Sequence, residues 1–332
     1  MKGEVPVKAG GVIGVLLLNL GGPDSLSAVR PFLFNLFSDR DIIRLGPSFM
    51  QRPLAHLIST MRHRKTEGFY RQIGGKSPIL DITAAQAREL EKGLNTPGGR
   101  RFSVFVGMRY WHPFIEDVVP VIYRKGIDRL VVLSLYPHYS VATTGSSVSK
   151  FKQVAGGLPI RSVTISSWYD HPLYIDALVN NIRKGMETFQ ESADPLHLLF
   201  SAHSLPAKFI EEGDPYVDQI KGTIKEVTKK IDLPHDLSYQ SRSGPVKWLE
   251  PSTDHMIEHL AGKGVKNLLV VPISFVSDHI ETLYEIDILY KRMAEGMGVR
   301  LERVESLNTS PLFISALRDI IEKDVEDAGW DG

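Results

Sequence analysis

The stretch Val265–Asp287, VKNLLVVPISFVSDHIETLYEID, carries the signals of a buried β-strand that runs into a helix. Its run Leu268–Phe275 is apolar and rich in β-branched residues, which is typical of a strand covered on both faces of a sheet. Ser277 and Asp278 are residue types that cap helix N-termini, so a helix is expected to begin after them. A strand joined to a helix in this way is the building unit of α/β folds. The stretch therefore predicts an α/β protein.

The helix expected after this strand begins with an imidazole and two carboxylates, those of His279, Glu281 and Glu285. Because Glu281 and Glu285 are four residues apart, both side chains fall on one face of a helix. Open α/β sheets bind their ligands at the carboxyl ends of strands, so the pattern favours a cation or proton site. An exposed acidic first turn that suits the helix dipole explains the same residues, and the spacing alone leaves both interpretations open.

The composition is that of an ordinary globular protein, and it excludes several kinds of site. The chain has 332 residues, of which 42% are hydrophobic and 23% charged, and this favours two domains with sizeable cores. The formal net charge is zero and the sequence pI is about 7.2, so no nucleic-acid partner is indicated. The sequence contains no cysteine, which excludes disulfides, zinc–thiolate sites and cysteine-ligated iron–sulfur clusters made by this chain.

Targeting and membrane signals are missing from the sequence. The segment Met1–Gly11 lacks the apolar core of a signal peptide. No apolar run reaches the ~18 residues that a membrane-spanning helix requires. A cytoplasmic location is therefore expected.

Strands and helices alternate along the whole chain, and the second half repeats the first. Lys125–Val132 (KGIDRLVV) parallels Lys263–Val270 (KGVKNLLV), and both precede a polar loop. Such alternation implies right-handed crossovers and parallel sheets, so we expect two Rossmann-like lobes, 1–167 and 168–332, around a shared cleft. The expected strands are Gly11–Leu20, Phe102–Val106, Arg129–Leu135, Ile160–Ile165, Leu196–Ser201, Leu237–Gln240, Leu268–Phe275 and Val299–Val304.

Polar residues at the expected strand ends are the candidates for chemistry. His203 ends the first strand of the second lobe, on the same sheet edge as Glu281. A lone histidine is most often structural, but its position opposite a carboxylate pair favours a functional role. Because no H-E-x-x-H motif is present, a weak and transient cation site fits better than a buried structural metal. The Gly21-Gly22 turn after the first strand lacks the G-x-G-x-x-G spacing and does not indicate a dinucleotide site.

Two further segments allow two interpretations each. Pro31–Phe37 (PFLFNLF) and the apolar residues up to Ile58, which include Phe49, are explained by core packing or by an exposed rim for a flat apolar ligand or a membrane surface. The polar run Thr143–Ser147 is explained by helix capping, which we favour, or by an anion held at a helix N-terminus.

Several long motifs are spread over nearly the whole chain. They are LLLNLGGPDS (16–25), YRQIGGKSPI (70–79), GMRYWHP (107–113), LYPHYSVATTGSS (135–147), FSAHSLP (200–206), QSRSGPVKWLEP (240–251) and VPISFVSDHIETLYEID (271–287). Together they resemble the ferrochelatase family. The resemblance implies two Rossmann-like lobes around a porphyrin cleft, and a lyase that inserts Fe²⁺ into protoporphyrin IX in the closing step of haem synthesis.

The resemblance also assigns roles to individual residues. His203 and Glu281 match the family's catalytic histidine and its partner carboxylate, and with Glu285 they form the implied metal contacts. The residues implied to bind the porphyrin are Leu20, Arg71, Arg109 and Tyr110. The implied partners are the porphyrin and Fe²⁺ as substrates, with peripheral contact to the inner membrane and no permanently bound cofactor.

Three positions or segments depart from relatives in this family. Val141 stands where animal relatives have an internal cysteine ligand of a [2Fe–2S] cluster, and their cysteine-bearing C-terminal extension is also missing, so the chain is similar to the cysteine-free bacterial type without a cluster. Leu289 occupies the place of a third carboxylate after Glu285, which puts a three-carboxylate metal path in doubt. No transit peptide precedes Gly11.

The implied reaction explains why these residue types are needed. A free-base porphyrin must lose two inner N–H protons as the metal enters, and a neutral imidazole accepts a proton near neutral pH. A carboxylate holds a cation loosely, and a pocket that bends the flat macrocycle exposes its nitrogen lone pairs. Two alternatives remain open: the same reaction on coproporphyrin III, and a non-catalytic haem or porphyrin carrier.

Overall fold

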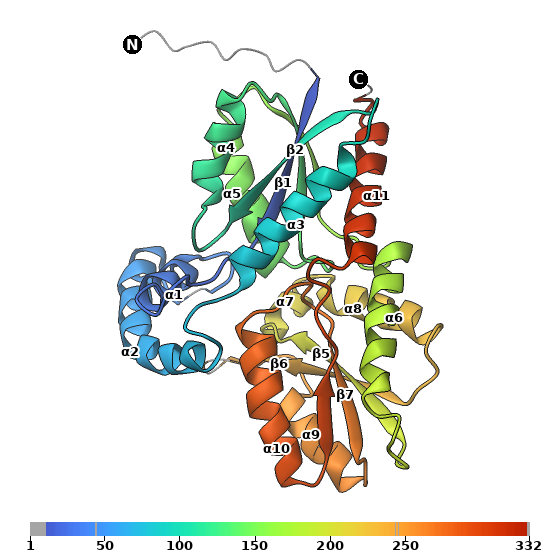
Figure 1. Cartoon of the computed structure of the whole chain (residues 1–332). Coiled ribbons are helices and arrows are strands. Elements are labelled where there is room, and N and C mark those ends of the chain that lie inside the picture. Colours follow the sequence, from blue (N-terminus) through green and yellow to red (C-terminus); the bar gives the residue numbers. More distant parts are fainter. Residues whose placement is uncertain (1–10, 44, 243, 245, 331–332) are drawn as a thin grey trace.

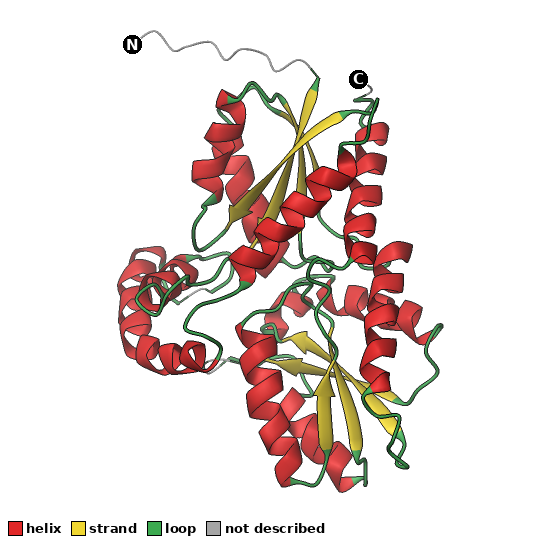
Figure 2. Cartoon of the chain, viewed as in Figure 1, coloured by secondary structure: helices red, strands yellow, loops and turns green. Residues whose placement is uncertain are grey.

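Two four-stranded parallel sheets organise the protein, one in each half of the chain (Figures 1 and 2). The computed structural model describes residues 11–43, 45–242, 244 and 246–330. The first sheet has the order β2-β1-β3-β4 and the second the order β6-β5-β7-β8, so the repeat in the sequence is also a repeat in topology. The strands are β1 (Val12–Asn19), β2 (Arg101–Met108), β3 (Arg129–Ser134), β4 (Arg161–Ile165), β5 (Leu196–His203), β6 (His235–Gln240), β7 (Asn267–Pro272) and β8 (Arg300–Arg303). The predicted fold class is confirmed.

The central strands are apolar along their length because helices cover both faces of each sheet. Every residue of β7 is buried, and β1 is buried from Ile13 to Asn19. In register, Leu16 of β1 pairs with Phe105 of β2 and with Val132 of β3. Such continuous apolar strands fix the sheets at the centre of each lobe.

Helices cover both faces of each sheet (Figure 2). In the first lobe α4 and α5 pack together on one face, and α3 packs beside β2 with α11 next to it. The helices of the first half are α1 (Val29–Ser38), η1 (Ser48–Met50), α2 (Gln51–Gln72), α3 (Ile79–Leu94), α4 (Ile115–Arg124), η2 (Val141–Gly145) and α5 (Ser146–Ala155). Those of the second half are α6 (Pro172–Glu187), α7 (Ala207–Glu211), α8 (Tyr216–Thr228), α9 (Thr253–Gly262), η3 (Glu281–Tyr290), α10 (Lys291–Gly296) and α11 (Pro311–Asp327).

The last helix, α11, returns to the first lobe, where it packs against α3 and near β3 and β4 (Figure 1). One apolar cluster accordingly contains Val15 of β1, Phe200 of β5 and Phe313 of α11. The two sheets thus share a core through α11 and α6. A division at residue 167 separates the two sheets, but the apolar core continues across it. The predicted domain boundary stays a prediction.

Helices α1 and α2 form an arm beside the junction of the two lobes (Figure 1). Their shared core contains Phe32, Leu33 and Phe37 of α1 with Ala55 and Tyr70 of α2. The apolar segment Pro31–Phe37 is therefore largely core. For α1 the structure agrees with core packing. Within the arm, the exposed apolar residues that could form a rim for a ligand or a membrane lie on η1 and α2.

The loop after β1 needs its two glycines for close packing. Gly21 has a φ of 84°, and a Cβ atom on Gly22 would lie 2.5 Å from Ser77 Oγ. A side chain at either position would be strained or would displace Ser77. The Gly-Gly turn therefore serves the contact between β1 and the start of α3.

The predicted capping by Ser277 and Asp278 is wrong. The helix after β7 begins at Glu281, the residue in the N-cap position is Ile280, and no side chain caps it. The carboxylate of Asp278 is instead occupied by Arg303, Ser306 and Asn308. The helix is also a π-helix rather than an α-helix, and the strand ends at Pro272 rather than Phe275. Tertiary hydrogen bonds therefore override the local capping signal.

The polar run Thr143–Ser147 spans a π-turn, η2, and the first residues of α5. Ser140, which lies before the run, supplies the cap because its side chain accepts a hydrogen bond from the Ala142 N–H. Thr144 and Ser146 make internal hydrogen bonds to Ser134 and Asp39. The prediction that residues of this run cap the helix is therefore wrong, because the cap comes from Ser140 and no side chain caps α5.

Candidate active site

The ends of two neighbouring strands bring His203 and Glu281 together. His203 is the last residue of β5, and Glu281 is the first residue of η3, which follows β7. Because β5 and β7 pair in parallel, their carboxyl ends meet at one edge of the sheet. His203 Nδ1 lies 2.8 Å from Glu281 Oε2. The juxtaposition expected from the sequence is present.

The electrostatics of this contact are those of an ion pair. Burial alone would lower the pKa of His203, but Glu281 outweighs it and raises the pKa. Burial would likewise raise the pKa of Glu281, yet the nearby His203 holds it well below its usual range. The His203 side chain remains 31% exposed and that of Glu281 17%. The pair therefore shares one proton at a partly open surface, where a reacting molecule can reach the imidazole.

Glu285 is linked to Glu281 through a serine that the sequence interpretation missed. Ser241 Oγ lies 2.8 Å from Glu281 Oε2 and 2.6 Å from Glu285 Oε2, and Gln240 Nε2 lies 3.3 Å from Glu285 Oε2. Burial and the charge of Glu281 raise the pKa of Glu285 to about 7. The Ser241 hydroxyl has one hydrogen and can donate it to only one of the two glutamates. A protonated Glu285 donates to Ser241 Oγ, which leaves the hydrogen of Ser241 for Glu281. The signal for Ser241 was its place directly after β6, the neighbour of β5.

The three predicted metal contacts are not assembled as a preformed site. Within the described part of the chain, no three histidine, aspartate or glutamate side chains are grouped so that they could hold a metal ion. His203 and Glu281 are instead bonded to each other, and Glu285 to Ser241. The metal-contact role of this trio stays a prediction.

The backbone of His203 is fixed by two residues that the sequence interpretation also missed. The His203 N–H donates to Ser274 Oγ at 3.0 Å, and Tyr216 Oη donates to the His203 carbonyl at 2.9 Å. The ring of Phe275 contacts His203 edge-on, with the two centroids 5.9 Å apart. These contacts hold the imidazole at the end of β5.

His279 belongs to the interior rather than to the open site. Burial lowers its pKa, its Nδ1 lies 3.0 Å from the Ser277 carbonyl oxygen, and its Nε2 has no hydrogen-bond partner. A cavity of about 10 Å³ beside it has room for about one water molecule. It is lined by Asn19, Ile79, Leu135, Tyr136, Phe275, Val276, Ser277 and His279. A hollow of about 420 Å³ near Arg100 and Glu322 lies by the amino end of β2 in the first sheet, whereas His203 lies at the carboxyl end of β5 in the second sheet.

Arg109 and Tyr110 use their polar atoms inside the protein. Arg109 Nη2 lies 2.5 Å from Asp39 Oδ2, and Tyr110 Oη donates to the same oxygen at 2.6 Å. Ser146 also donates to it at 2.6 Å. Burial would raise the pKa of Asp39, but these three partners lower it. Tyr110 is 1% exposed, so its hydroxyl holds Asp39, and its porphyrin contact stays a prediction.

Leu20 lies beside Tyr110, whose N–H donates to the Leu20 carbonyl at 2.9 Å. Both side chains belong to the apolar cluster of α1 and α2, to which Ile280, directly before Glu281, also contributes. The predicted wall residues and the acidic helix therefore meet in one cluster.

Arg71 lies in the last turn of α2, exposed and 3.5 Å from Glu67 Oε2. Phe69 stacks on Tyr284 of η3 with the ring centroids 4.3 Å apart, so this end of α2 touches the acidic helix. Lys65 Nζ lies 5.7 Å from the centre of the Phe69 ring. Lys65 is thus a second cation near the site that the sequence interpretation missed, and the carboxylate-binding role of Arg71 stays a prediction.

The exposed apolar residues of the arm lie on η1 and α2. Phe49 is 76% exposed and Met61 73%, and Met50 and Leu57 are exposed with them. No helix in the described part of the chain is both long and apolar enough to cross a bilayer.

Comparisons with known proteins agree with this geometry. A family profile described as Ferrochelatase matches residues 12–325. A ferrochelatase of Geotalea uraniireducens (strain Rf4) is 53% identical over 315 residues, which cover 94% of this chain and 97% of that protein. A ferrochelatase of Geobacter metallireducens is 52% identical over 93% of this chain and 97% of its own, and one of Desulfotalea psychrophila is 51% identical over 93% and 96%.

Solved structures show a likeness in fold. The structure of SirB from Bacillus subtilis with Fe³⁺ has a TM-score of 0.57 at 10% identity, and the match covers 96% of this chain and 98% of that chain. The sirohydrochlorin chelatase SirB in complex with cobalt has a TM-score of 0.55 at 11% identity over 95% of each chain. Both share the two-lobed α/β architecture with this chain.

Proposed function

This chain belongs to the ferrochelatase family, and we propose that its His203–Glu281 pair takes up the protons that a porphyrin loses as Fe²⁺ enters. The chain is a ferrochelatase, and we assign it to the lyase class as a metal chelatase. The observation that carries the proposal is the 2.8 Å contact between His203 Nδ1 and Glu281 Oε2 at a partly open sheet edge. A porphyrin carrier would have no use for such a pair.

The proton path follows from the contacts that join the four side chains. The contact with Glu281 raises the pKa of His203, so the neutral imidazole is a stronger proton acceptor than a free one. Glu285, whose pKa is raised to about 7, changes its protonation near neutral pH. Ser241 lies within hydrogen-bond distance of both glutamates. The proton that His203 already holds can therefore pass by way of Glu281 and Ser241 to the ionised form of Glu285, and the imidazole is then free to accept a proton from the porphyrin. Because the groups are coupled, the cluster titrates as a unit.

We propose protoporphyrin IX as the organic substrate and Fe²⁺ as the metal substrate. The apolar cluster that contains Leu20 and Tyr110 supplies a wall for the macrocycle. Arg71 supplies a cation for a propionate, and Lys65, over the ring of Phe69, is a second cation on the same helix. Glu281 and Glu285 are the proposed oxygen contacts of the incoming iron, with His203. Because the chain has no cysteine, we propose that it works without a permanently bound cofactor or an iron–sulfur cluster. An absorbance spectrum of the purified protein between 400 and 550 nm, the range roughly expected of a thiolate-ligated cluster, should be flat.

We also propose that the protein acts in the cytoplasm and touches the inner membrane peripherally through η1 and α2. Phe49 of η1 and Met61 of α2 are strongly exposed there, and α2 also carries Arg52, Arg64 and Lys65. Exposed apolar side chains flanked by cations suit a surface of anionic lipid.

The test of the function is a metal-insertion assay on the purified protein. Fe²⁺ or Zn²⁺ is mixed with protoporphyrin IX or coproporphyrin III, and the product is followed by absorbance. We expect turnover with protoporphyrin IX. Faster turnover with coproporphyrin III would move the substrate assignment to that tetracarboxylate, and tight porphyrin binding without any turnover would make the protein a carrier.

A further inference from the structure

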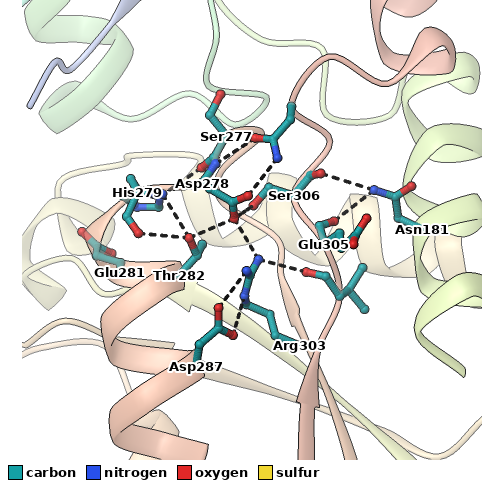
Figure 3. A network of polar contacts seen from close by, with 12 residues as sticks. Asn181, Ser277, Asp278, His279, Glu281, Thr282, Asp287, Arg303, Glu305 and Ser306 are labelled. Carbon is teal, nitrogen blue, oxygen red and sulfur yellow. Dashed lines mark hydrogen bonds and ion pairs between the residues drawn. The ribbon is translucent and has the colours of Figure 1, made fainter. Parts of the chain in front are cut away.

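Arg303, the last residue of β8, binds carboxylates on both sides of the two site glutamates (Figure 3). Arg303 Nε and Nη2 donate to the two oxygens of Asp287 at 2.7 and 2.9 Å, and Nη1 donates to Asp278 Oδ1 at 2.9 Å. Asp278 lies before Glu281 in the chain, and Asp287 lies after Glu285. The guanidinium therefore spans the segment that carries both glutamates.

Asp278 is itself held from several directions. It accepts hydrogen bonds from Ser306 Oγ at 2.8 Å and from Thr282 Oγ1 at 3.2 Å. Asn308 makes a reciprocal pair with it: Asn308 Nδ2 donates to Asp278 Oδ2 at 2.8 Å, and the Asp278 N–H donates to Asn308 Oδ1 at 3.0 Å. With these partners the carboxylate is a fixed anchor for Arg303.

The anchor is tied to both lobes. Gln86 of α3 donates from Nε2 to Ser277 Oγ at 3.0 Å and to the Asn308 carbonyl at 2.8 Å. Asn181 of α6 donates to the carbonyl of Glu305 at 3.0 Å, as Figure 3 shows. The segment before η3 is therefore fixed relative to α3 of the first lobe as well as to the second sheet.

The attachment matters for the site because η3, which carries both glutamates, is a π-helix. Helices with i→i+5 bonds are rare and are found mostly as single turns, so the ten residues of η3 need outside support. A change of helical pitch would rotate Glu285 relative to Glu281 and away from Ser241. The planar guanidinium of Arg303 donates two parallel hydrogen bonds to Asp287, so it fixes the orientation of that carboxylate as well as its distance. The ammonium group of a lysine cannot make such a pair of bonds.

We propose that Arg303 is a positioning residue for metal insertion: with Asp278 and Asp287 it fixes the pitch of η3, so that Glu281 faces His203 and Glu285 faces Ser241. Arg303 acts through these side chains, and its own is only 10% exposed. The inference rests on the proposed chelatase reaction for its kinetic test.

The test compares Arg303→Lys and Asp287→Asn with the matched control Arg300→Lys. Arg300 lies on the same strand, but its partners are Glu302 and the Thr188 carbonyl, away from η3. For both test variants we expect kcat to fall about tenfold or more, since small misplacements of catalytic groups are costly. The apparent KM for Zn²⁺ should rise, while the porphyrin affinity, measured by fluorescence, stays within twofold. Arg300→Lys should match the wild type.

A double-mutant cycle separates positioning from stability. Because Arg303 is proposed to act through Glu285, Arg303→Lys should raise the apparent KM for Zn²⁺ much less in a Glu285→Gln background than in the wild type. Additive effects, or a loss of activity that only follows the fraction of folded protein, would overturn the positioning role. If Arg303→Lys does not fold, the kcat and KM of Asp287→Asn alone test the positioning role. An inactive wild type would instead contradict the chelatase function itself.

Discussion

Glu281 and Glu285 are chemically alike, but their surroundings give them different tasks. Glu281 is bonded to His203 and its pKa is lowered, whereas burial and the neighbouring charge raise the pKa of Glu285 to about 7. We expect Glu281→Gln to lower kcat by about 10²–10⁴-fold, the usual range for loss of acid–base chemistry, with porphyrin binding kept. Glu285→Gln should mainly raise the apparent KM for the metal. Steady-state kinetics with Zn²⁺ and a porphyrin measure both.

An equal loss of kcat in the two variants would contradict this ranking and would mean that the two carboxylates act as one unit. Leu289 provides a related check, because it is 48% exposed on the same helix. Leu289→Glu adds a carboxylate one turn beyond Glu285, and we expect a lower apparent KM for the metal with kcat unchanged.

The buried carboxylate of Asp39 makes the stability of the protein depend on pH. Its pKa is lowered by Ser146, Tyr110 and Arg109 against the effect of burial. The stability that it contributes is therefore complete above its unfolded pKa of about 3.9, and it is lost as the pH falls through the lower folded value. Asp39→Asn should cost about 2–3 kcal/mol at pH 7, because it leaves Arg109, whose side chain is 14% exposed, without its charge partner.

The measurement for Asp39 is the free energy of unfolding in urea as a function of pH. The wild type should lose stability below about pH 4, and Asp39→Asn should lose less over the same range. The control is Asp81→Asn, which breaks an exposed pair with Lys76 at 2.7 Å and should cost less than about 1 kcal/mol. Parallel pH curves for wild type and Asp39→Asn would refute the assignment.

At the scale of the element, η1 and α2 expose apolar side chains among cationic ones. Phe49 and Met61 protrude there, whereas Phe32 and Phe37 of α1 are buried beneath. We expect Phe49→Asp and Met61→Asp each to weaken flotation with vesicles of anionic lipid several-fold. A carboxylate is costly to bury in the lipid, and the anionic headgroups repel it. Leu312→Asp, an exposed apolar position on α11, is the control. Unchanged flotation in both test variants would end the membrane proposal.

The elements differ in how far the sequence predicts them. The buried strands β1 and β7 follow from their continuous apolar runs, and the meeting of His203 with Glu281 follows from parallel pairing of β5 and β7. The π-helix does not follow, because the same sequence has the pattern of an α-helix and its pitch depends on Arg303 and Asp278. Ser241 was missed for a similar reason, since its contact with Glu285 spans 44 residues of sequence.

At the scale of the whole molecule, the repeat in the sequence gives two similar sheets, but the lobes are not independent. The return of α11 to the first lobe depends on packing that no local pattern reveals. Gln86 and Asn308 join the lobes directly beside η3. The sequence therefore predicts the lobes, while the way in which one lobe supports the site of the other comes from the structure.

Proton uptake from a bound porphyrin is the task that we propose for the His203–Glu281 pair. The most direct measurement is metal insertion by His203→Ala, with porphyrin affinity followed on the same samples by fluorescence. We expect kcat to fall about 10²–10⁴-fold while the porphyrin affinity stays within twofold of wild type. A kcat within threefold of wild type at unchanged porphyrin affinity would contradict the proposed task.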